Sequence, residues 1–524
     1  MASAAPASAT AFVPHAPLEG AARVWGTVAL SAATFMNVLD SSIANVSLPA
    51  IAGDLGVSAT QGTWVITSFA VANAIGVPLT GWLTQRFGQV RLFMASIVLF
   101  MVFSWLCGLA PNMTTLILFR AMQGLVAGPM IPLSQTLLLS SYPRAKAGLA
   151  MSMWAMTTLV APVMGPLLGG WITDNVSWPW IFYINIPVGL LAAGITWKLY
   201  RKRESPTKSL PIDSIGLALL VLWVGALQLM LDKGKELDWF QSTEVVVMAV
   251  VAVVGFAFFL VWELTEEHPV VDLSLFRRRN FWTGAVAMAI AYGLFFGNVV
   301  LLPLWLQQFM GYTATQAGMV LAPVGLFAIL LSPMVGLTVG KVDPRRYTTI
   351  SFLVFALVLW MRSRFNTQAD MATIMIPTII QGVAMAFFFI PLVTLTLSGL
   401  SPDRLPAASG LSNFLRITAG AMGTSIATTV WDSRAAMHHS QLVESVTQGN
   451  AAAGDAIKGL GSSGLSPDQV LAQLNGVVTQ QAYMLATADV FYASAVLFVL
   501  LVPLVWLARP QRGGAGSDAA AGAH

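Results

Sequence analysis

Asp40 and Arg120 are charged residues that lie deep inside long apolar stretches of the sequence. If those stretches cross a membrane, each charge costs about 2.5–3.5 kcal/mol on insertion scales, and such residues usually face a cavity and have a function. A carboxyl group removed from water holds its proton more tightly, so Asp40 could exchange a proton near neutral pH. Asp40 is therefore the predicted proton carrier, with a structural ion pair or a helix-packing hydrogen bond as the alternative role.

Arg120 is the predicted partner of Asp40. It shares one helix face with Gln123, Gly124 and Ala127 by i, i+3, i+4 and i+7 spacing. Arginine stays protonated in proteins, so Arg120 cannot carry the coupling proton itself. It can favour the charged form of a nearby acid in one conformation and release that acid in another. A purely structural arginine meets the same desolvation requirement and is an equal alternative.

The second half of the sequence lacks a matching acid. Arg416 lies near Asn413, but Asn298 stands where an acid would correspond to Asp40. Proton chemistry is therefore predicted to be concentrated in the first half.

Polar and aromatic side chains within the apolar stretches are candidates for the lining of a substrate cavity. Around Asp40 they recur at helical spacing as Thr34, Asn37, Ser41 and Asn45. The full set of cavity candidates is Asn37, Asn45, Trp64, Gln123, Tyr292, Asn298, Gln307, Phe388, Asn413 and Arg416, with Gln308 and Phe389 beside them. For any single aromatic residue, packing or lipid contact is the more common use.

Small residues form a stripe at four-residue spacing at Ala161, Gly165 and Gly169, with Pro166 and Gly170 beside them. Such a stripe lets two membrane helices approach closely, and prolines bend the helix. Many membrane helices simply associate through such a stripe, so by itself it is weak evidence for a function.

The composition explains how these residues are solvated. Of 524 residues, 56% are hydrophobic and 10% are charged, whereas a soluble domain carries roughly a quarter charged. The single cysteine, Cys107, excludes a disulfide framework, and the five histidines show no metal-ligand spacing. No G-x-x-x-x-G-K-[ST] loop is present to bind a nucleotide. An all-α membrane protein without a cofactor is predicted, with the proton as its coupling ion.

Fourteen apolar runs are long enough to cross a bilayer, which needs roughly 20 residues. They are 24–49, 61–83, 92–110, 114–139, 147–172, 180–199, 212–231, 244–264, 281–309, 316–339, 347–364, 372–399, 406–430 and 485–508. With both termini in the cytoplasm, most of the 27 Lys and Arg residues fall on the inside, as the positive-inside rule requires. Arg362 and Arg364, at the end of the span 347–364, then fall on the external side.

Segments of the first half of the sequence recur in the second half at an offset of about 260 residues, as expected of a secondary transporter. Gln123-Gly124 followed by Ile131-Pro132-Leu133 recurs as Gln381-Gly382 followed by Ile390-Pro391-Leu392. The predicted organisation is a cytoplasmic tail (1–22), a six-helix half (23–200), two inserted helices with their loops (201–280), a second six-helix half (281–508) and a flexible tail (509–524).

A long external loop is predicted at 431–484. Ser466-Pro467-Asp468-Gln469 is a helix-start signature. The apolar spacing that follows predicts an amphipathic helix to about Tyr483, and the segment 459–464 is predicted to be a flexible hinge. The apolar stripe of this helix either packs on the chain's own outer surface or docks a partner protein.

These segments resemble the major facilitator superfamily, and within it the fourteen-helix drug:proton antiporter family. Asp40 and Arg120 match motif residues that this family links to proton transfer. Gly165, Pro166, Gly169 and Gly170 match its fifth-helix antiporter motif, which is associated with export. The segment 81–88, with Gly81, Arg86 and Gly88, resembles its cytoplasmic gating loop. Gln85 departs from the pattern, because the family has an acid there.

The resemblance implies the major facilitator fold and a proton-coupled antiporter of the bacterial inner membrane that exports hydrophobic drugs. It also implies a tripartite pump, with a periplasmic membrane-fusion adaptor of the EmrA type and an outer-membrane channel of the TolC type. Asp40 and the repeat alone would also permit an uptake symporter. A channel or receptor is disfavoured, because gating does not need a buried acid at that depth.

Overall fold

The chain folds almost entirely into helices, and its described part contains no strand. The computed structural model describes residues 16–509 except 58, 144–145, 209–210, 212, 313, 447–450 and 462–465. Helices lie over all fourteen apolar runs. The described residues contain ten helices that are long and apolar enough to cross a membrane, or eleven if a bent pair counts as one span. The all-helical membrane fold is thus confirmed, and the count of fourteen spans stays a prediction.

The N-terminal half comprises α1 to α10. Its helices are α1 (Gly20–Asp54), α2 (Ala59–Gly62), α3 (Trp64–Gly76), α4 (Thr80–Phe87), α5 (Gln89–Gly108), α6 (Met113–Ala127), α7 (Met130–Ser141), α8 (Ala147–Asn175), α9 (Trp180–Tyr183) and α10 (Asn185–Tyr200). The insertion comprises α11 (Ser214–Lys233), η2 (Trp239–Gln241), α12 (Thr243–Thr265) and η3 (Leu273–Arg277).

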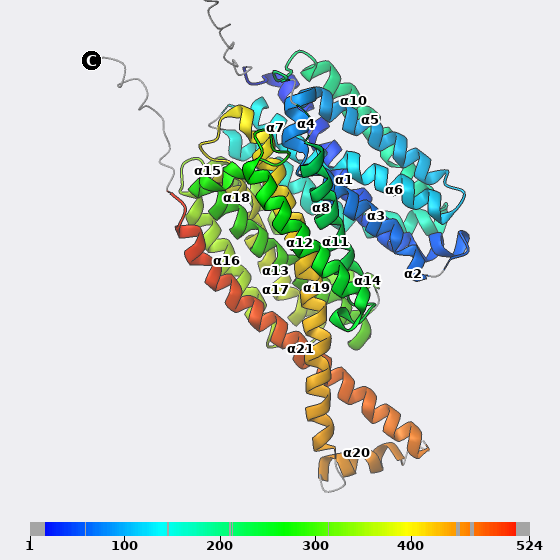
Figure 1. Cartoon of the computed structure of the whole chain (residues 1–524). Helices are drawn as coiled ribbons and strands as arrows, with labels where there is room; N and C mark the ends of the chain where they lie inside the picture. Colours follow the sequence, from blue (N-terminus) through cyan, green and yellow to red (C-terminus); the bar gives the residue numbers. More distant parts are fainter. Residues whose placement is uncertain are drawn as a thin grey trace, which may run out of the picture.

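The C-terminal half comprises α13 to α21. Its helices are α13 (Arg279–Phe309), α14 (Ala314–Leu321), α15 (Pro323–Thr338), α16 (Pro344–Arg362), α17 (Met371–Ala386), α18 (Phe389–Thr396), η4 (Pro402–Arg404), α19 (Leu405–Ser445), α20 (Ala451–Gly461) and α21 (Pro467–Trp506). The start of α1 and the end of α21 lie toward the same end of the bundle, which we call the terminal face (Figure 1).

Several predicted spans are broken into two helices just before a proline. The break between α3 and α4 bends the chain by 61° and contains Pro78. The break between α6 and α7 contains Pro129. Proline lacks the N–H that would bond to the carbonyl four residues earlier, and its ring crowds that carbonyl. Such breaks persist at membrane depth only where neighbouring helices satisfy the freed groups.

Most of the segment 431–484, which was predicted to be a loop, is helical, so that prediction is wrong. α19 continues to Ser445 and α21 begins at Pro467, so both arms are helical and project from the bundle with α20 between them (Figure 1). The helix start at Ser466 is confirmed, with a capping box to Gln469. The helix does not end at Tyr483, because no glycine or proline follows to stop it before the last span. Gly459 is still helical in α20, and 462–465 lie outside the described residues.

The base of this helical hairpin is held by charged groups. Arg434 of α19 forms an ion pair with Asp489 of α21 at 2.6 Å, and His438 Nε2 lies 2.8 Å from the same carboxylate. The Trp431 indole donates to the Thr487 hydroxyl at 2.8 Å. The two long helices are therefore fastened to each other where they leave the bundle.

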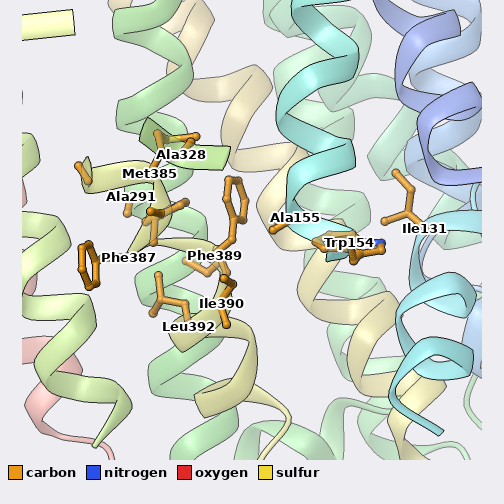
Figure 2. Packing of buried hydrophobic residues seen from close by; sticks show 14 of the residues in the cluster. Ile131, Trp154, Ala155, Ala291, Ala328, Met385, Phe387, Phe389, Ile390 and Leu392 are labelled. Carbon is orange, nitrogen blue, oxygen red and sulfur yellow. The ribbon is translucent and has the colours of Figure 1, made fainter. Parts of the chain in front are cut away.

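The two halves meet near the terminal face. The backbones of Gly148 in α8 and Gly336 in α15 are in direct contact, and Gly81 packs against Ala407 of α19. Ser409 donates a hydrogen bond to Gln135 of the other half. Buried apolar side chains of both halves form one cluster, and Figure 2 shows Trp154 and Ala155 on one side and Phe389 on the other.

Substituting Gly336 by valine should push the halves apart, because a Cβ atom there would overlap the backbone of Gly148 and Leu149. Such overpacking costs about 1–3 kcal/mol. We expect a lower thermal unfolding midpoint and faster maleimide labelling of Ser409→Cys, tested in a Cys107→Ser background. Gly325→Val in the same helix is the control, since a Cβ atom there meets nothing within 4 Å. Equal effects of the two valines would contradict the contact.

Candidate functional site

Asp40 and Arg120 form a buried ion pair between α1 and α6. Arg120 Nη1 lies 2.5 Å from Asp40 Oδ2. Asp40 is 0% exposed and Arg120 is 1% exposed. The predicted pairing is therefore present in the structure, although the proton-transfer role of either residue stays a prediction.

The remaining lone pairs of the Asp40 carboxylate are also used. Asn185 Nδ2 of α10 donates to Oδ1 at 2.8 Å, and Gln123 Nε2 donates to the same oxygen at 3.2 Å. Asn185 also donates to the hydroxyl of Ser104 in α5, at 3.0 Å. Asn185 was missed in the sequence, where the available signal was a polar residue between Ile184 and Ile186 inside an apolar run. Groups from α6 and α10 thus converge on one carboxylate of α1, and α5 holds Asn185 in place.

Arg120 is held as firmly as its partner. Its Nε donates to the carbonyl of Val65 in α3 at 3.1 Å, and its Nη1 donates to Gln123 Oε1 at 2.8 Å. The guanidinium carbon lies 4.3 Å from the ring centroid of Phe69 and 5.4 Å from that of Phe182. Such cation–π contacts contribute about 2 kcal/mol when desolvated. The cation is therefore stabilised by two rings in addition to its acid.

A change in the protonation of Asp40 would alter the contacts that hold this network together. A proton on Asp40 would cancel the charge that pairs with Arg120, and the buried guanidinium would then need another partner or water. The lost attraction bears on α1, α3, α6 and α10 together, because each contributes a contact to the pair.

The polar face of α1 points mainly into the N-terminal half. Thr34 donates to Ser134 of α7 at 2.7 Å, and Asn37 Nδ2 donates to the Ala127 carbonyl at 3.0 Å. Asn45 is exposed. Thr34 and Asn37 therefore serve as interhelical hydrogen-bonding groups in this conformation.

The stripe of small residues at Ala161, Gly165 and Gly169 packs α8 directly against α1. A Cβ atom on Gly165 would overlap the side chain of Ser42, and one on Gly169 would meet Ile43. Both neighbours follow Asp40 within one turn of α1. The side chain of Pro166 lies outside the described residues, and Gly170 is half-buried. The stripe thus sets how close α8 approaches the helix that carries the acid.

An acidic residue from a distant part of the chain, Glu204, binds next to the gating loop (81–88). Glu204 accepts hydrogen bonds from the backbone N–H groups of Val90 and Arg91, each at 2.9 Å. Those N–H groups lie in the first turn of α5, where the helix dipole favours a negative charge. The Gln85 carbonyl accepts from Lys208 N at 2.8 Å. Glu204 was missed in the sequence because it lies far along the chain, beside the basic run 201–203.

The other gating-loop residues have distinct roles. Gly81 allows the contact with Ala407 described above. The guanidinium carbon of Arg86 lies 6.0 Å from the ring centroid of Trp82. Gly88 has φ +90°, which is the left-handed region that a side chain disfavours. A Cβ atom there would also overlap Glu204.

The matching loop of the C-terminal half is held by Asp343. Its carboxylate accepts from Arg345 N at 3.0 Å and binds the Arg345 guanidinium, with Nη2 at 2.5 Å from Oδ2. Burial by itself raises the pKa of Asp343, but the hydrogen bonds and charge of Arg345 outweigh it and leave the pKa below its ordinary value. This carboxylate therefore stays ionised and caps α16.

The C-terminal half has arginines where the N-terminal half has its acid site. Asn298 Nδ2 donates to the Leu294 carbonyl and to Ser494, in contacts of 2.6 and 3.0 Å. Arg362 was predicted on the external side, at the end of the span 347–364, and it is the last residue of α16. Its side chain is 1% exposed and donates to Thr378 and Gln381. It can be buried because α17 supplies polar acceptors.

The other cavity candidates divide into two groups. Asn413 and Arg416 line a pocket between the halves together with Gln135 and Trp154, and Tyr292 stacks on Arg416. Trp64, Gln307 and Phe388 do not line that pocket. The ring of Trp64 contacts Lys233 of the insertion, Gln307 is exposed, and Phe388 is packed among phenylalanine rings.

A family model described as Major Facilitator Superfamily matches residues 30–424. The chain belongs to the major facilitator superfamily. It is 51% identical over 509 residues to the multidrug export protein EmrB of Escherichia coli K12, covering 97% of this chain and 99% of that protein. It is 48% identical over 504 residues to the fatty acid resistance protein FarB of Neisseria gonorrhoeae, covering 96% and 99%.

A solved structure confirms the superfamily fold. The crystal structure of the human organic anion transporter MFSD10 (TETRAN) matches with a TM-score of 0.58, covering 93% of this chain and 100% of that chain. The sequences are 14% identical, so the likeness concerns the fold alone. The predicted major facilitator fold is confirmed, and the chain is a multi-pass membrane protein.

Replacing Arg120 by methionine should lower the free energy of unfolding by about 3–5 kcal/mol, because it leaves a buried carboxylate without its cation. Adding Asp40→Asn should recover most of that loss, since neither charge then remains. The measurement is a double-mutant cycle by denaturant unfolding in detergent. Arg91→Met is the control, because Arg91 is exposed. Strictly additive effects of the two substitutions would show that the pair does not interact.

Proposed function

We propose that the chain is a proton-coupled antiporter that exports hydrophobic drugs and toxic compounds across the bacterial inner membrane, with both termini in the cytoplasm. The observation that carries the proposal is the Asp40 carboxylate of α1, which is buried, hydrogen-bonded from α6 and α10 and paired with a single cation. The relatives named as a multidrug export protein and a fatty acid resistance protein support export of apolar compounds.

In the proposed cycle, Asp40 takes up a proton from the outer side and releases it to the cytoplasm as the halves rock. The contact between α8 and α15 at the terminal face would close the cytoplasmic side in the present conformation. Protonation weakens the Asp40–Arg120 attraction, so the bundle can repack and open that face. Substrate and proton then cross in opposite directions.

Asp40→Asn should abolish export driven by a pH gradient, because the amide cannot carry a proton, while Asp40→Glu should retain part of it with a shifted pH optimum. Uptake of radiolabelled hydrophobic drugs by everted vesicles with an acidified lumen measures this activity. Asp54→Asn, at the end of the same helix, is the control.

Two results would overturn the proposal. Wild-type transport by Asp40→Asn would remove the residue from coupling. Accumulation that requires protons to move with the drug would instead favour an uptake symporter.

We further propose that the helical hairpin docks a periplasmic membrane-fusion adaptor of the EmrA type, which joins an outer-membrane channel of the TolC type in a tripartite pump. The apolar stripe of the distal part of α21 is divided. Val470 and Val478 are buried, whereas Leu471 is 58% exposed and Val477 is 49% exposed. The exposed residues need a cover that the described chain does not provide, and such patches often mark partner sites.

Replacing residues 440–474 by a short Gly/Ser linker should preserve transport into everted vesicles but abolish adaptor pull-down and cellular drug resistance. The splice is feasible because His439 Nε2 lies 3.0 Å from Asn475 Oδ1, so the two arms are adjacent there. The point variants Leu471→Lys and Val477→Lys should weaken the pull-down. Gln473→Lys, which is exposed on the same arm, should not. Full adaptor capture by the shortened chain would place the docking site elsewhere.

A further inference from the structure

Asn185 is a buried amide that contacts the Asp40 carboxylate from α10. It is 1% exposed, and its Nδ2 donates to Asp40 Oδ1 at 2.8 Å. Gln123 Nε2 donates to the same oxygen at 3.2 Å, while Arg120 binds Oδ2. Asn185 therefore makes the shorter of the two amide hydrogen bonds to Oδ1.

The Asn185 amide is also held by α5. Its Nδ2 donates to Ser104 Oγ at 3.0 Å, and the Ser104 hydroxyl donates to the Phe182 carbonyl at 2.8 Å. Ser104 is 0% exposed. An amide nitrogen carries two N–H groups, and Asp40 and Ser104 occupy both. The amide therefore cannot swing away from Asp40 without giving up a buried hydrogen bond, which is costly.

Asn185 has this position because the helix is interrupted just before it. α9 ends at Tyr183 and α10 begins at Asn185, with Pro187 in its first turn. Proline lacks the N–H that would bond to the carbonyl four residues earlier. Ser104 bonds to the Phe182 carbonyl on one side of the break and to Asn185 on the other. The interrupted segment and the acid are thus joined through one serine.

Few charged groups compete with these contacts. Among the described residues, Arg120 alone forms an ion pair with Asp40, and the nearby thiol of Cys107 donates to Gln123 Oε1 at 3.6 Å. Titratable side chains of the other helices around α1 are at the ends of those helices: Arg91 of α5, Asp174 of α8, Tyr183 of α9 and Lys198 of α10. The charge of Asp40 is therefore stabilised by one cation and by neutral donors, of which Asn185 makes the shortest contact.

We propose that Asn185 is a positioning residue for proton coupling, which favours the charged form of Asp40 and so sets the pH at which this acid gives up its proton. The inference rests on the proposed proton-coupled export and adds a residue to its coupling machinery. A hydrogen bond donated to a carboxylate stabilises its charged form. Because the amide is neutral, it does so without cancelling the charge that holds Arg120.

Removing this donor should make Asp40 harder to deprotonate. The carboxylate would lose a charge-assisted hydrogen bond, whereas the protonated acid would lose only a weaker neutral one. The acid then keeps its proton to a higher pH, and release to the cytoplasm needs a more alkaline medium. A shift of about one pH unit, which is tenfold in proton affinity, is expected for one such bond.

Infrared titration of the protein in lipid nanodiscs measures the protonation of Asp40, because a carboxylic acid and a carboxylate absorb at different frequencies. Subtracting the spectrum of the matching Asp40→Asn protein isolates this band. The midpoint for Asn185→Leu should lie about one pH unit above that of the wild type. Asn185→Gln keeps an amide donor and should recover part of the shift. Ser104→Ala loosens the amide and should produce part of it, which keeps the test available if Asn185→Leu does not fold.

Ser47→Ala is the matched control. Ser47 is also on α1 and fully buried, but it hydrogen-bonds to Thr173 of α8, at 2.7 Å. Its loss should leave the midpoint of Asp40 unchanged. Export by everted vesicles should show the same upward shift for Asn185→Leu when the pH of the medium is varied. A merely structural role would lower the rate at every pH and leave the midpoint in place.

An unchanged midpoint in Asn185→Leu would overturn the inference, as would an equal shift in Ser47→Ala or the absence of any titration of Asp40 in both proteins. Asp40→Asn separates the two proposals. Wild-type transport by that variant would remove proton coupling itself. Loss of its transport, together with an unchanged midpoint in Asn185→Leu, would overturn the role of Asn185 alone.

Discussion

Burial of charge in a bundle solvated by lipid is the constraint on which the rest of the structure depends. Asp40 can lie fully buried because Arg120, Gln123 and Asn185 satisfy its carboxylate from two other helices. The same helix, α1, is approached so closely by α8 at Gly165 that a larger residue there would overlap Ser42. The buried ion pair and the close approach of α8 therefore both depend on the position of α1.

The insertion adds a second constraint, because α11 is fastened to both halves at the end opposite the terminal face. The Asp232 carboxylate accepts from Thr67 of α3. The carbonyl of Leu231 accepts from Ser425 of α19 at 2.6 Å. At the terminal face, the linkers of the insertion bind the gating loop and, through an ion pair at 2.5 Å, Arg404. The insertion is therefore bonded to both halves at one end and to the gating loop and Arg404 at the other.

The two halves share a fold but differ in charge. The N-terminal half encloses a neutral pair, whereas the C-terminal half encloses Arg362 and Arg416 without an acid among the described residues. Asn298 at the position related to Asp40 accounts for part of this difference.

The sequence by itself determined the membrane class, the positions of the helices, the repeat and the pairing of Asp40 with Arg120. These follow from apolar length, helical spacing and the cost of a charge in lipid, which are local properties of the chain. The start of α21, with Ser466 as its N-cap, was equally predictable from the local sequence, since a capping box needs only four residues.

Only the tertiary structure decided which distant groups meet. Asn185 and Glu204 reach their partners across 145 and 114 residues of chain, respectively, and nothing in their own neighbourhood marks those partners. The same holds for Arg362, whose buried acceptors Thr378 and Gln381 lie on the next helix, α17, and for the arms of the hairpin. Burial depends on which helices pack together, and helix packing is a property of the whole bundle.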